Sequence, residues 1–457
     1  MGVGGQAFTI DWQGLSWLIV KAWPHGYSGK IPSIFKKSRV PKEKTYNREE
    51  IIMSRVLEGI RVVDLSHVLA APTCTMFLAD LGAEVIHIEP PHGDDSREFG
   101  PFVGEQDKNK SGYFISLNRN KKSMVLNLKH EKGKKILREL IEVSDVIVEN
   151  FRPTTMRKLG FGWEDIKKIN PRMIYASICG FGHDTLPGYD TRPAYDMVAQ
   201  GYSGIMSITG PEEGPPCRVG SSVGDIFAGH QAVIGILAAL FHREKTGKGQ
   251  YHDGAMVDGL FAVLENAAVR YTVDGTVPGP LGSAHPSITP FQGFQTKDSW
   301  IITPIGNDNL WATFCKVIER EDLTNDQRFA TNPLRTRNKK ELIPVLADEL
   351  KKRTTKEWSD IFENAGLPYS PINTMKDICE DPHITYRKML VEIDQPLVGK
   401  IKIAGSPIHL SETPGEVYDP APLLGEHTEE VLREILGYSQ EEIDELTQEK
   451  VINSTTL

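Results

Sequence analysis

A single acidic residue, Asp225, stands at the start of the long apolar stretch within Val219 to Phe241. Small residues precede it and apolar side chains then recur at helical spacing, so the sequence predicts that Asp225 lies near a helix N-terminus. Unpaired backbone N–H groups and the helix dipole favour an ionised carboxylate there. A carboxylate in that place is suited to act as a nucleophile. Capping of the helix is the alternative role, and the commoner one for an aspartate.

The segments that precede Asp225 alternate between short apolar runs and helical patterns. Strands are predicted at 60–65, 84–89, 123–128, 145–149 and 173–178, and helices at 72–81 and 131–143. Strand, helix and strand in succession imply right-handed parallel units. The sequence therefore predicts an α/β fold with a doubly wound, Rossmann-like large domain.

Ligands of such sheets bind beyond the carboxyl ends of the strands, so residues 66–72 and 150–153 are candidate site loops. Ordinary connecting loops are the alternative interpretation. Glu89 ends the second strand, where an acid can hold a ribose. The first strand–helix turn, however, contains no glycine, and without the G-x-G-x-x-G fingerprint a nicotinamide dehydrogenase is disfavoured.

Composition narrows the class of protein further. The net charge of -9 and the pI near 5.9 argue against a nucleic-acid partner. Five widely spaced cysteines without a C-x-x-C pair indicate a reducing compartment and no zinc site, and we expect no metal. No apolar run is long enough for a membrane span. We expect a cytoplasmic protein with a poorly structured extension at 1–52, or a mitochondrial matrix protein if that extension is a transit segment.

Several motifs together resemble one family, the class III CoA-transferases, which includes formyl-CoA transferase and carnitine CoA-transferase. The motifs lie at 57–72, 81–90, 93–97, 118–123, 148–153, 194–196, 224–225, 245–250 and 422–428. The segments Gly93-Asp-Asp-Ser-Arg97 and Ala284-His-Pro-Ser-Ile288 are most similar to the branch with acetyl-CoA:oxalate and succinyl-CoA:glutarate CoA-transferases. The resemblance covers about 55 to 440 and leaves out residues 1–52.

The resemblance implies an interlocked-ring homodimer. Each chain would hold a large Rossmann-like domain whose N-terminal part is 53–250, a linker helix at 251–275, a smaller α+β domain at 276–385, and a return segment at 386–457 that completes the large domain. The substrates would be a short acyl-CoA or dicarboxylyl-CoA and a carboxylic acid, with no permanently bound cofactor.

The resemblance also assigns the site residues. Asp225 would be the catalytic nucleophile, forming first a mixed anhydride and then an aspartyl-CoA thioester, while backbone donors near Leu69 and Ala70 would hold the oxyanions. The residues expected against the CoA substrate are His67, Val68, Leu69, Ala70, Leu126, Asn127, Leu128, Lys129, Asn150, Phe151 and Lys158. Further substrate contacts are expected from Tyr195, Asp196, Gly282 and His285.

Two alternatives stay open from the sequence. A 2-methylacyl-CoA racemase of the same superfamily needs a histidine and aspartate pair, but Tyr195 occupies the histidine position. A non-catalytic CoA-binding homologue is disfavoured by the intact Asp225.

Overall fold

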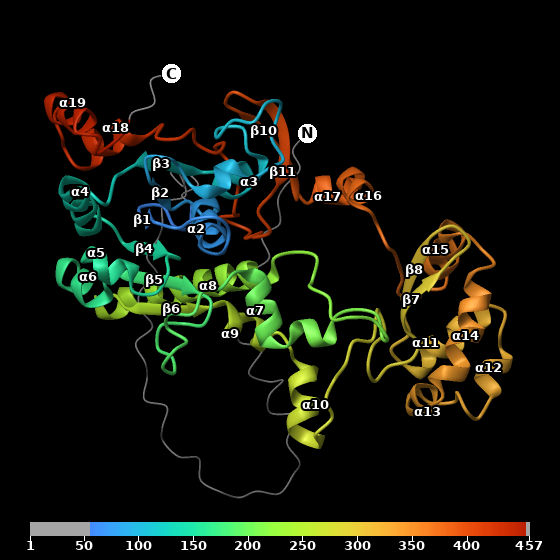
Figure 1. Ribbon diagram of the computed structural model, residues 1–457. Helices are drawn as coiled ribbons and strands as arrows, with labels where there is room; N and C mark the ends of the chain where they lie inside the picture. Colours follow the sequence, from blue (N-terminus) through green and yellow to red (C-terminus); the bar gives the residue numbers. More distant parts are fainter. Residues whose placement is uncertain (1–54, 454–457) are drawn as a thin grey trace, which may run out of the picture. The chain divides into compact units, whose positions relative to one another are not determined.

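The computed structural model describes residues 55–453 and contains a six-stranded parallel sheet (Figure 1). The strand order is β3-β2-β1-β4-β5-β6. The strands are β1 (Arg61–Asp64), β2 (Glu84–Glu89), β3 (Lys121–Val125), β4 (Val146–Glu149), β5 (Ile174–Cys179) and β6 (Tyr251–Ala255). This order confirms the doubly wound α/β prediction, because it reverses direction between β1 and β4.

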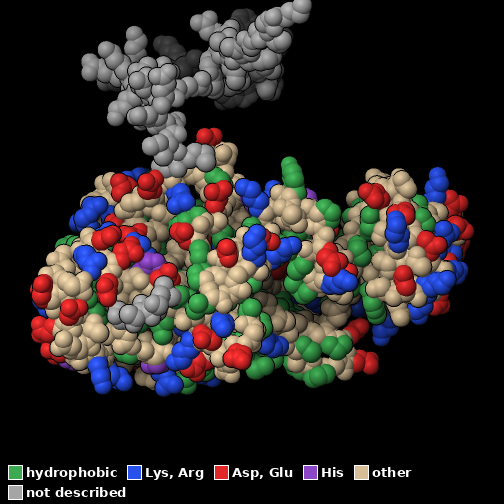
Figure 2. All heavy atoms as spheres, turned by 90° about the horizontal axis from the view of Figure 1, so that it is seen from above, with side chains coloured by type: hydrophobic (Ala, Val, Ile, Leu, Met, Phe, Trp, Pro, Cys, Tyr) green, Lys and Arg blue, Asp and Glu red, His purple; other side chains and the backbone are tan. Residues whose placement is uncertain are grey.

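The surface carries both signs of charge. Figure 2 shows one face, on which the acidic and basic side chains are interspersed and do not gather by sign. This distribution fits the acidic composition and offers no basic stripe on the face shown.

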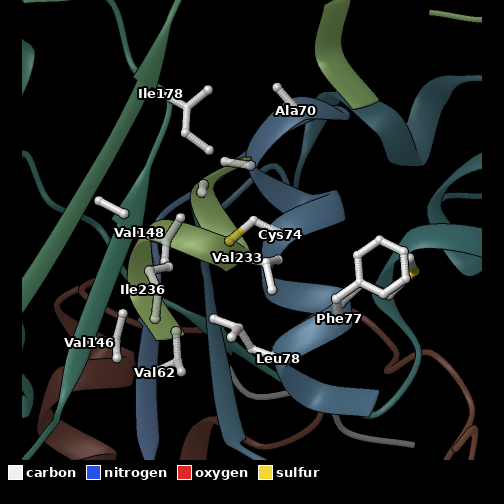
Figure 3. Packing of buried hydrophobic residues seen from close by; sticks show 14 of the residues in the cluster. Val62, Ala70, Cys74, Phe77, Leu78, Val146, Val148, Ile178, Val233 and Ile236 are labelled. Atoms are coloured by element: carbon white, nitrogen blue, oxygen red, sulfur yellow. The ribbon is translucent and has the colours of Figure 1, made fainter. Parts of the chain in front are cut away.

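Alternate residues of the strands point to opposite faces of the sheet and build two cores. Val62, Val146 and Val148 face the helices α2 (Ala70–Asp80) and α8 (Val223–Thr246), as Figure 3 shows. Val63 and Ile147 face the other core, which is formed with α4 (Glu131–Glu142), α6 (Trp163–Ile169) and α19 (Gln440–Gln448). Both faces of the sheet are therefore covered, as a parallel sheet requires.

The C-terminal segment completes the second core. This core buries side chains that come long after the last strand of the six-stranded sheet in the sequence. They are Val431, Leu432, Ile443 and Leu446. Ser439 and Glu442 form the capping box that opens α19, as their spacing predicts. This packing fits the expected return of the chain to the large domain.

Residues 291–371 build a separate core around Trp311, Phe314 and Phe362. Its antiparallel sheet has the order β7-β8-β9, with β7 (Phe291–Gln295), β8 (Trp300–Pro304) and β9 (Ser370–Pro371). Its helices are α11 (Asp308–Val317), α12 (Asp322–Asn325), α13 (Asn332–Arg337), α14 (Lys339–Leu350) and α15 (Thr355–Asn364). This composition matches the smaller α+β unit expected here, while the domain boundaries stay predictions.

The remaining elements connect these parts. They are η1 (Asp95–Glu98), α3 (Gly112–Asn118), α5 (Thr155–Leu159), α7 (Asp196–Ser203), η2 (Ile205–Ile208), α9 (Met256–Ala262), α10 (Asn266–Asp274), α16 (Met375–Glu380), α17 (Pro382–Tyr386), β10 (Leu390–Gln395), β11 (Gly399–Ala404), α18 (Thr428–Glu430) and η3 (Val431–Ile435). The extension predicted at 1–52 lies outside the described residues.

The predicted linker helix at 251–275 is wrong in its first part. Tyr251–Ala255 forms β6 and pairs in parallel with β5, and two separate helices, α9 and α10, follow. The apolar residues of this segment have a helical spacing, which led to the wrong prediction. Pairing with an open edge of the sheet outweighs this local preference. Other boundaries shift by two residues: α2 begins at Ala70 and not at Pro72, and β3 begins at Lys121 and not at Ser123.

Helix α8 is long and apolar enough to cross a membrane by length and composition. The sequence prediction missed this because polar residues such as Gln231 interrupt the apolar run. Ala232, Ile236 and Ala239 on its inner face are buried in the core against the sheet and α2. The apolar character of α8 is therefore accounted for by core packing.

Helix α8 also touches the start of α2 through Gly229. A Cβ at position 229 would lie 2.6 Å from the Ala70 carbonyl oxygen and 2.9 Å from Cβ of Thr73. Since both contacts involve a buried helix, only glycine permits this approach.

The contact predicts that Gly229→Ala forces α8 away from α2 and lowers the free energy of unfolding by about 1–3 kcal/mol, as overpacking does. Urea denaturation measures this loss. Gly306→Ala is the matched control, since its Cβ would meet open space. Equal stability of the two variants would show that the contact at Gly229 is not tight.

Candidate functional site

A cavity of about 720 Å³ lies at the carboxyl ends of β1 to β4. It is lined by the segments that follow each of these strands, as the strand order predicts. The predicted CoA contacts among its lining residues are His67, Leu126, Asn127, Leu128, Lys129 and Phe151. The structure therefore brings together predicted residues from three separate segments of the sequence, which follow β1, β3 and β4.

The loop after β1 is held by hydrogen bonds at nearly every residue. Asn150 accepts from the His67 N–H at 2.9 Å and donates to the His67 carbonyl at 2.9 Å, which ties the loops after β1 and β4 together. Asp64 accepts from the N–H of Ser66. Among the described residues, no acceptor takes the N–H of Leu69 or of Ala70, at the start of α2. Two backbone donors are thus left free for a ligand.

Asp225 is the third residue of α8 and precedes Gly229 by one helical turn. Residues four apart share a helix face, and side chains lean toward the helix N-terminus. Because Gly229 packs on Ala70, Asp225 lies on the face of α8 that is turned toward α2. It is half-buried, and no group within residues 55–453 donates a hydrogen bond to it.

The cap of α8 comes from a different acid, Asp196. Its Oδ1 accepts from the Gly224 N–H at 2.8 Å, and its Oδ2 accepts from Gln200 at 2.8 Å. Asp196, expected among the substrate contacts, is buried and serves here to hold the helix end. The capping role left open for Asp225 is therefore filled by Asp196.

Burial raises the pKa of Asp225 to about 7, and the nearby Asp196 carboxylate adds to the rise. The sequence had favoured an ionised carboxylate because of the helix N-terminus. Burial and the Asp196 charge outweigh that influence, since Asp196 already accepts from a first-turn N–H. At neutral pH a large share of Asp225 is ionised and poorly solvated, which makes it a reactive carboxylate.

Tyr113 of α3 belongs to the same neighbourhood and was missed by the sequence analysis. Burial raises the pKa of its hydroxyl, and the Asp225, Asp94 and Asp196 carboxylates raise it further. Its phenol is therefore protonated and able to donate a hydrogen bond near Asp225. The only signal in the sequence was its place within a polar segment between β2 and β3.

The cavity also includes residues 90–95, which were not predicted as contacts. They follow β2, so the rule that places ligands beyond strand carboxyl ends would have found them. Behind them, Arg97 pairs with Glu89 at 2.7 Å. Burial opposes ionisation of Glu89, but the Arg97 guanidinium holds its pKa at about 2. The carboxylate that suggested a ribose contact is thus engaged in a buried ion pair.

Nine of the predicted contact residues do not line the cavity, namely Val68, Leu69, Ala70, Asn150, Lys158, Tyr195, Asp196, Gly282 and His285. Lys158 is exposed on α5, next to Leu159, which does line it. Tyr195 is 78% exposed at the start of α7. Gly282 donates to Gly210, and His285 donates to Phe291 through backbone bonds. Their roles as substrate contacts stay predictions.

The fold is a doubly wound sheet with a cavity at its switch point. Within residues 55–453, a half-buried aspartate on α8 receives no hydrogen bond, and two backbone N–H groups at the start of α2 have no acceptor. The model of CoA-transferase family III matches residues 57–428. The chain belongs to this family and is a class III CoA-transferase.

Known relatives agree with this assignment. The chain is 42% identical over 399 residues to succinyl-CoA:glutarate CoA-transferase of Homo sapiens, covering 87% of this chain and 90% of the relative. It is 42% identical over 357 residues to acetyl-CoA:oxalate CoA-transferase of Acetobacter aceti, covering 78% and 89%. A crystal structure of a CAIB/BAIF family protein from Brucella suis aligns with a TM-score of 0.75 at 37% identity, over 83% of this chain and 99% of that one.

The raised pKa of Asp225 predicts a pH-dependent cost to stability. Because the folded-state pKa of about 7 lies above the ordinary 3.8, the folded protein binds the proton more tightly, and stability falls as pH rises between these values. Asp225→Asn removes the titration. We expect the free energy of unfolding of Asp225→Asn to exceed that of the wild type by about 1–2 kcal/mol above pH 7, after allowance for solvent screening. Near pH 4 the two free energies should be equal.

Urea denaturation at several pH values measures this difference. Asp274→Asn is the control. Hydrogen bonds from Thr276 lower the pKa of the exposed Asp274, so the substitution should change stability in the opposite direction. A pH-independent difference between wild type and Asp225→Asn would contradict the expected ionisation.

Proposed function

We propose that the enzyme moves CoA from a short acyl-CoA or dicarboxylyl-CoA to a carboxylic acid by covalent catalysis at Asp225. The observation that carries the proposal is the half-buried Asp225 carboxylate, which receives no hydrogen bond from residues 55–453 and lies on the helix that packs against the start of α2. There the N–H groups of Leu69 and Ala70 have no acceptor among the described residues. The contact between α8 and α2 supports the proposal that Asp225 serves as the nucleophile and that these amides serve as the oxyanion site.

In the first half of the reaction, an Asp225 oxygen attacks the donor thioester carbon. The C–S bond breaks, CoA thiolate leaves, and a mixed anhydride remains on Asp225. The thiolate then attacks the carbonyl carbon of Asp225, which releases the donor acid and leaves an aspartyl-CoA thioester. Relay through the enzyme divides one difficult exchange into easier steps.

In the second half, the acceptor carboxylate attacks the aspartyl thioester carbon and expels CoA thiolate. The thiolate attacks the acceptor side of the new anhydride, which forms the product thioester and restores the Asp225 carboxylate. Each attack places negative charge on a carbonyl oxygen, and the N–H groups of Leu69 and Ala70 are free to stabilise it.

The cavity beside this site is proposed to hold the CoA moiety. Its volume of about 720 Å³ is in the range of small-molecule sites. His67 and Phe151 form an aromatic pair at 5.5 Å within it, which suits contact with a planar base. Lys129 at the cavity and Lys158 on the neighbouring helix α5 supply positive charge for phosphate groups.

A dicarboxylate system is the proposed substrate class, with succinyl-CoA as donor and glutarate as acceptor. The similarity to the human enzyme over most of both chains supports this choice. The motifs at 93–97 and 284–288 support the same branch.

A homodimer is proposed from the family resemblance and from an apolar surface. Large apolar side chains are exposed on α8, α9 and α10, including Ile234, Phe241, Phe261 and Val273. Exposed apolar residues on neighbouring elements are typical of protein interfaces. A second copy of the chain is the proposed occupant, and the interlocked arrangement belongs to the same proposal.

The proposed compartment is the cytoplasm, or the mitochondrial matrix if residues 1–52 act as a transit segment. All five cysteines are free, and Cys74, Cys179 and Cys315 are buried, which fits a reducing environment. Nucleic acid and membranes are not among the proposed partners.

The mechanism predicts that the wild type transfers CoA from succinyl-CoA to glutarate and that Asp225→Ala loses at least about 10³-fold in kcat, since a covalent nucleophile is removed. Chromatography of CoA esters measures transfer across a panel of donors and acids. Hydroxylamine should inactivate wild type incubated with acyl-CoA, whereas a racemase or simple binder would be spared. Turnover retained by Asp225→Ala, with CoA binding intact, would reject the mechanism.

The dimer proposal predicts that Ile234→Glu combined with Phe241→Glu yields monomers, because two charges would be buried in an apolar interface. Sedimentation velocity measures the mass. Leu397→Glu is a control, since Leu397 is also exposed but lies in the turn between β10 and β11. A wild type that sediments as a monomer would remove the basis of this proposal.

A further inference from the structure

A cluster of buried charges lies beneath the loop that carries the free amides. Asp64, at the end of β1, accepts from Lys121 at 3.1 Å and from Thr75 at 2.7 Å, and His87 Nδ1 lies 3.2 Å from it. Burial opposes ionisation of Asp64, but Lys121 and His87 hold its pKa well below the usual range. The charged side chains of the cluster are Asp64, His87, Glu89, Asp94, Arg97 and Lys121, all of them buried.

The cluster extends to the loop through Asp94. His87 Nε2 has no hydrogen-bond partner in the part of the chain that the structure describes, and it lies 3.8 Å from Asp94 Oδ2. Both residues line the cavity. Asp94 Oδ1 accepts from the Ser96 N–H at 2.6 Å. The Val68 N–H points at the same carboxylate, 3.2 Å from Oδ2 and 3.4 Å from Oδ1.

Val68 holds a backbone conformation that its side chain disfavours. Its φ is +66°, in the left-handed region that β-branched residues rarely adopt. Such a conformation persists only when surrounding contacts enforce it, and it is common at functional sites. At Val68, the contact that enforces this conformation is the hydrogen bond from its N–H to the Asp94 carboxylate.

The position of Val68 decides where the next two amides point. It lies between His67, which Asn150 clamps, and Leu69, whose carbonyl accepts from the Thr73 N–H within α2. With both neighbours fixed, a change of φ at Val68 would have to rotate the peptide groups that follow. The aim of the Leu69 and Ala70 N–H groups therefore depends on Val68 keeping its conformation.

We propose that Asp94 is a positioning residue of the transfer site. Its own N–H donates to Glu89 and its carboxylate accepts from Ser96, and thus anchored it keeps Val68 left-handed and so aims the amides of Leu69 and Ala70 at the reacting carbonyl. Asp94 acts through the backbone and takes no part in bond making. The inference rests on the proposed acylation of Asp225 for its kinetic consequence, but the loop geometry itself is independent of that chemistry.

Asp94→Asn tests the proposal with little change of volume. The oxygen of the new side-chain amide would keep its hydrogen bond from Ser96. The NH2 group would then point toward the Val68 N–H, so two hydrogen-bond donors would face each other. Hydrogen exchange followed by mass spectrometry should show faster exchange in a peptide covering 66–71, because the contact that holds the loop is lost. Asp80→Asn is the matched control: Asp80 is equally buried, but its partners Arg119 and Asn120 do not touch this loop.

The kinetic readout is single-turnover formation of the Asp225 adduct from acyl-CoA. Asp94→Asn should slow it on the order of 10- to 100-fold, with a smaller change in KM for the thioester, as misplacement of catalytic groups does. In a Val68→Gly background, Asp94→Asn should reduce the rate of adduct formation by a factor at least about threefold smaller. Glycine adopts a positive φ without support from Asp94.

The outcomes separate this inference from the proposed function. Unchanged exchange in the 66–71 peptide of Asp94→Asn, or equal changes in Asp80→Asn, would overturn the positioning role. An identical kinetic loss in the wild-type and Val68→Gly backgrounds would also overturn it. If wild type forms no adduct, the proposed mechanism fails, while the exchange experiment still decides whether Asp94 orders the loop.

Discussion

The close approach of α8 to the start of α2 is the contact on which the rest of the site depends. Gly229 lets the two helices meet at the Ala70 carbonyl, and both helices begin at the same edge of the sheet. One helix contributes a carboxylate, and the other contributes two unpaired backbone donors. The proposed mechanism needs both helices, because acyl transfer requires a nucleophile and charge stabilisation within one small volume.

The electrostatics of the site follow from how the hydrogen bonds are divided between two aspartates. Asp196 takes the Gly224 N–H and the Gln200 amide, so it is a buried but well-bonded anion. Asp225 has no such donor and bears the cost of burial next to a like charge, which raises its pKa. A fold that solvated Asp225 well would stabilise the carboxylate and make it less suited to the proposed role as nucleophile.

Buried charges elsewhere serve rigidity. Glu89 and Arg97 form a pair whose two bonds fix the segment that follows β2, and Asp64 gathers Lys121 and His87 under the loop after β1. Taking such groups from water is costly, so they contribute to specificity of the geometry more than to net stability. This cost is reasonable where an amide must point in one direction, as the left-handed Val68 indicates.

The sequence by itself determined the parallel sheet, the place of Asp225 near a helix start, and the loops at the carboxyl ends of β1 and β4. These features are local: they follow from hydrophobic period, from small residues before a helix, and from the rule that sequential strands and helices wind in one hand. The family motifs added the nucleophile assignment and the CoA contacts, of which six line the cavity.

Only the tertiary structure decided which aspartate caps α8, that Tyr251–Ala255 joins the sheet, and that Asp94 supports Val68. Each of these depends on a partner far away in the chain or on the local depth of burial. Sequence spacing carries no information on such contacts, since a hydrogen bond or a pKa depends on distance and solvent access in the folded molecule.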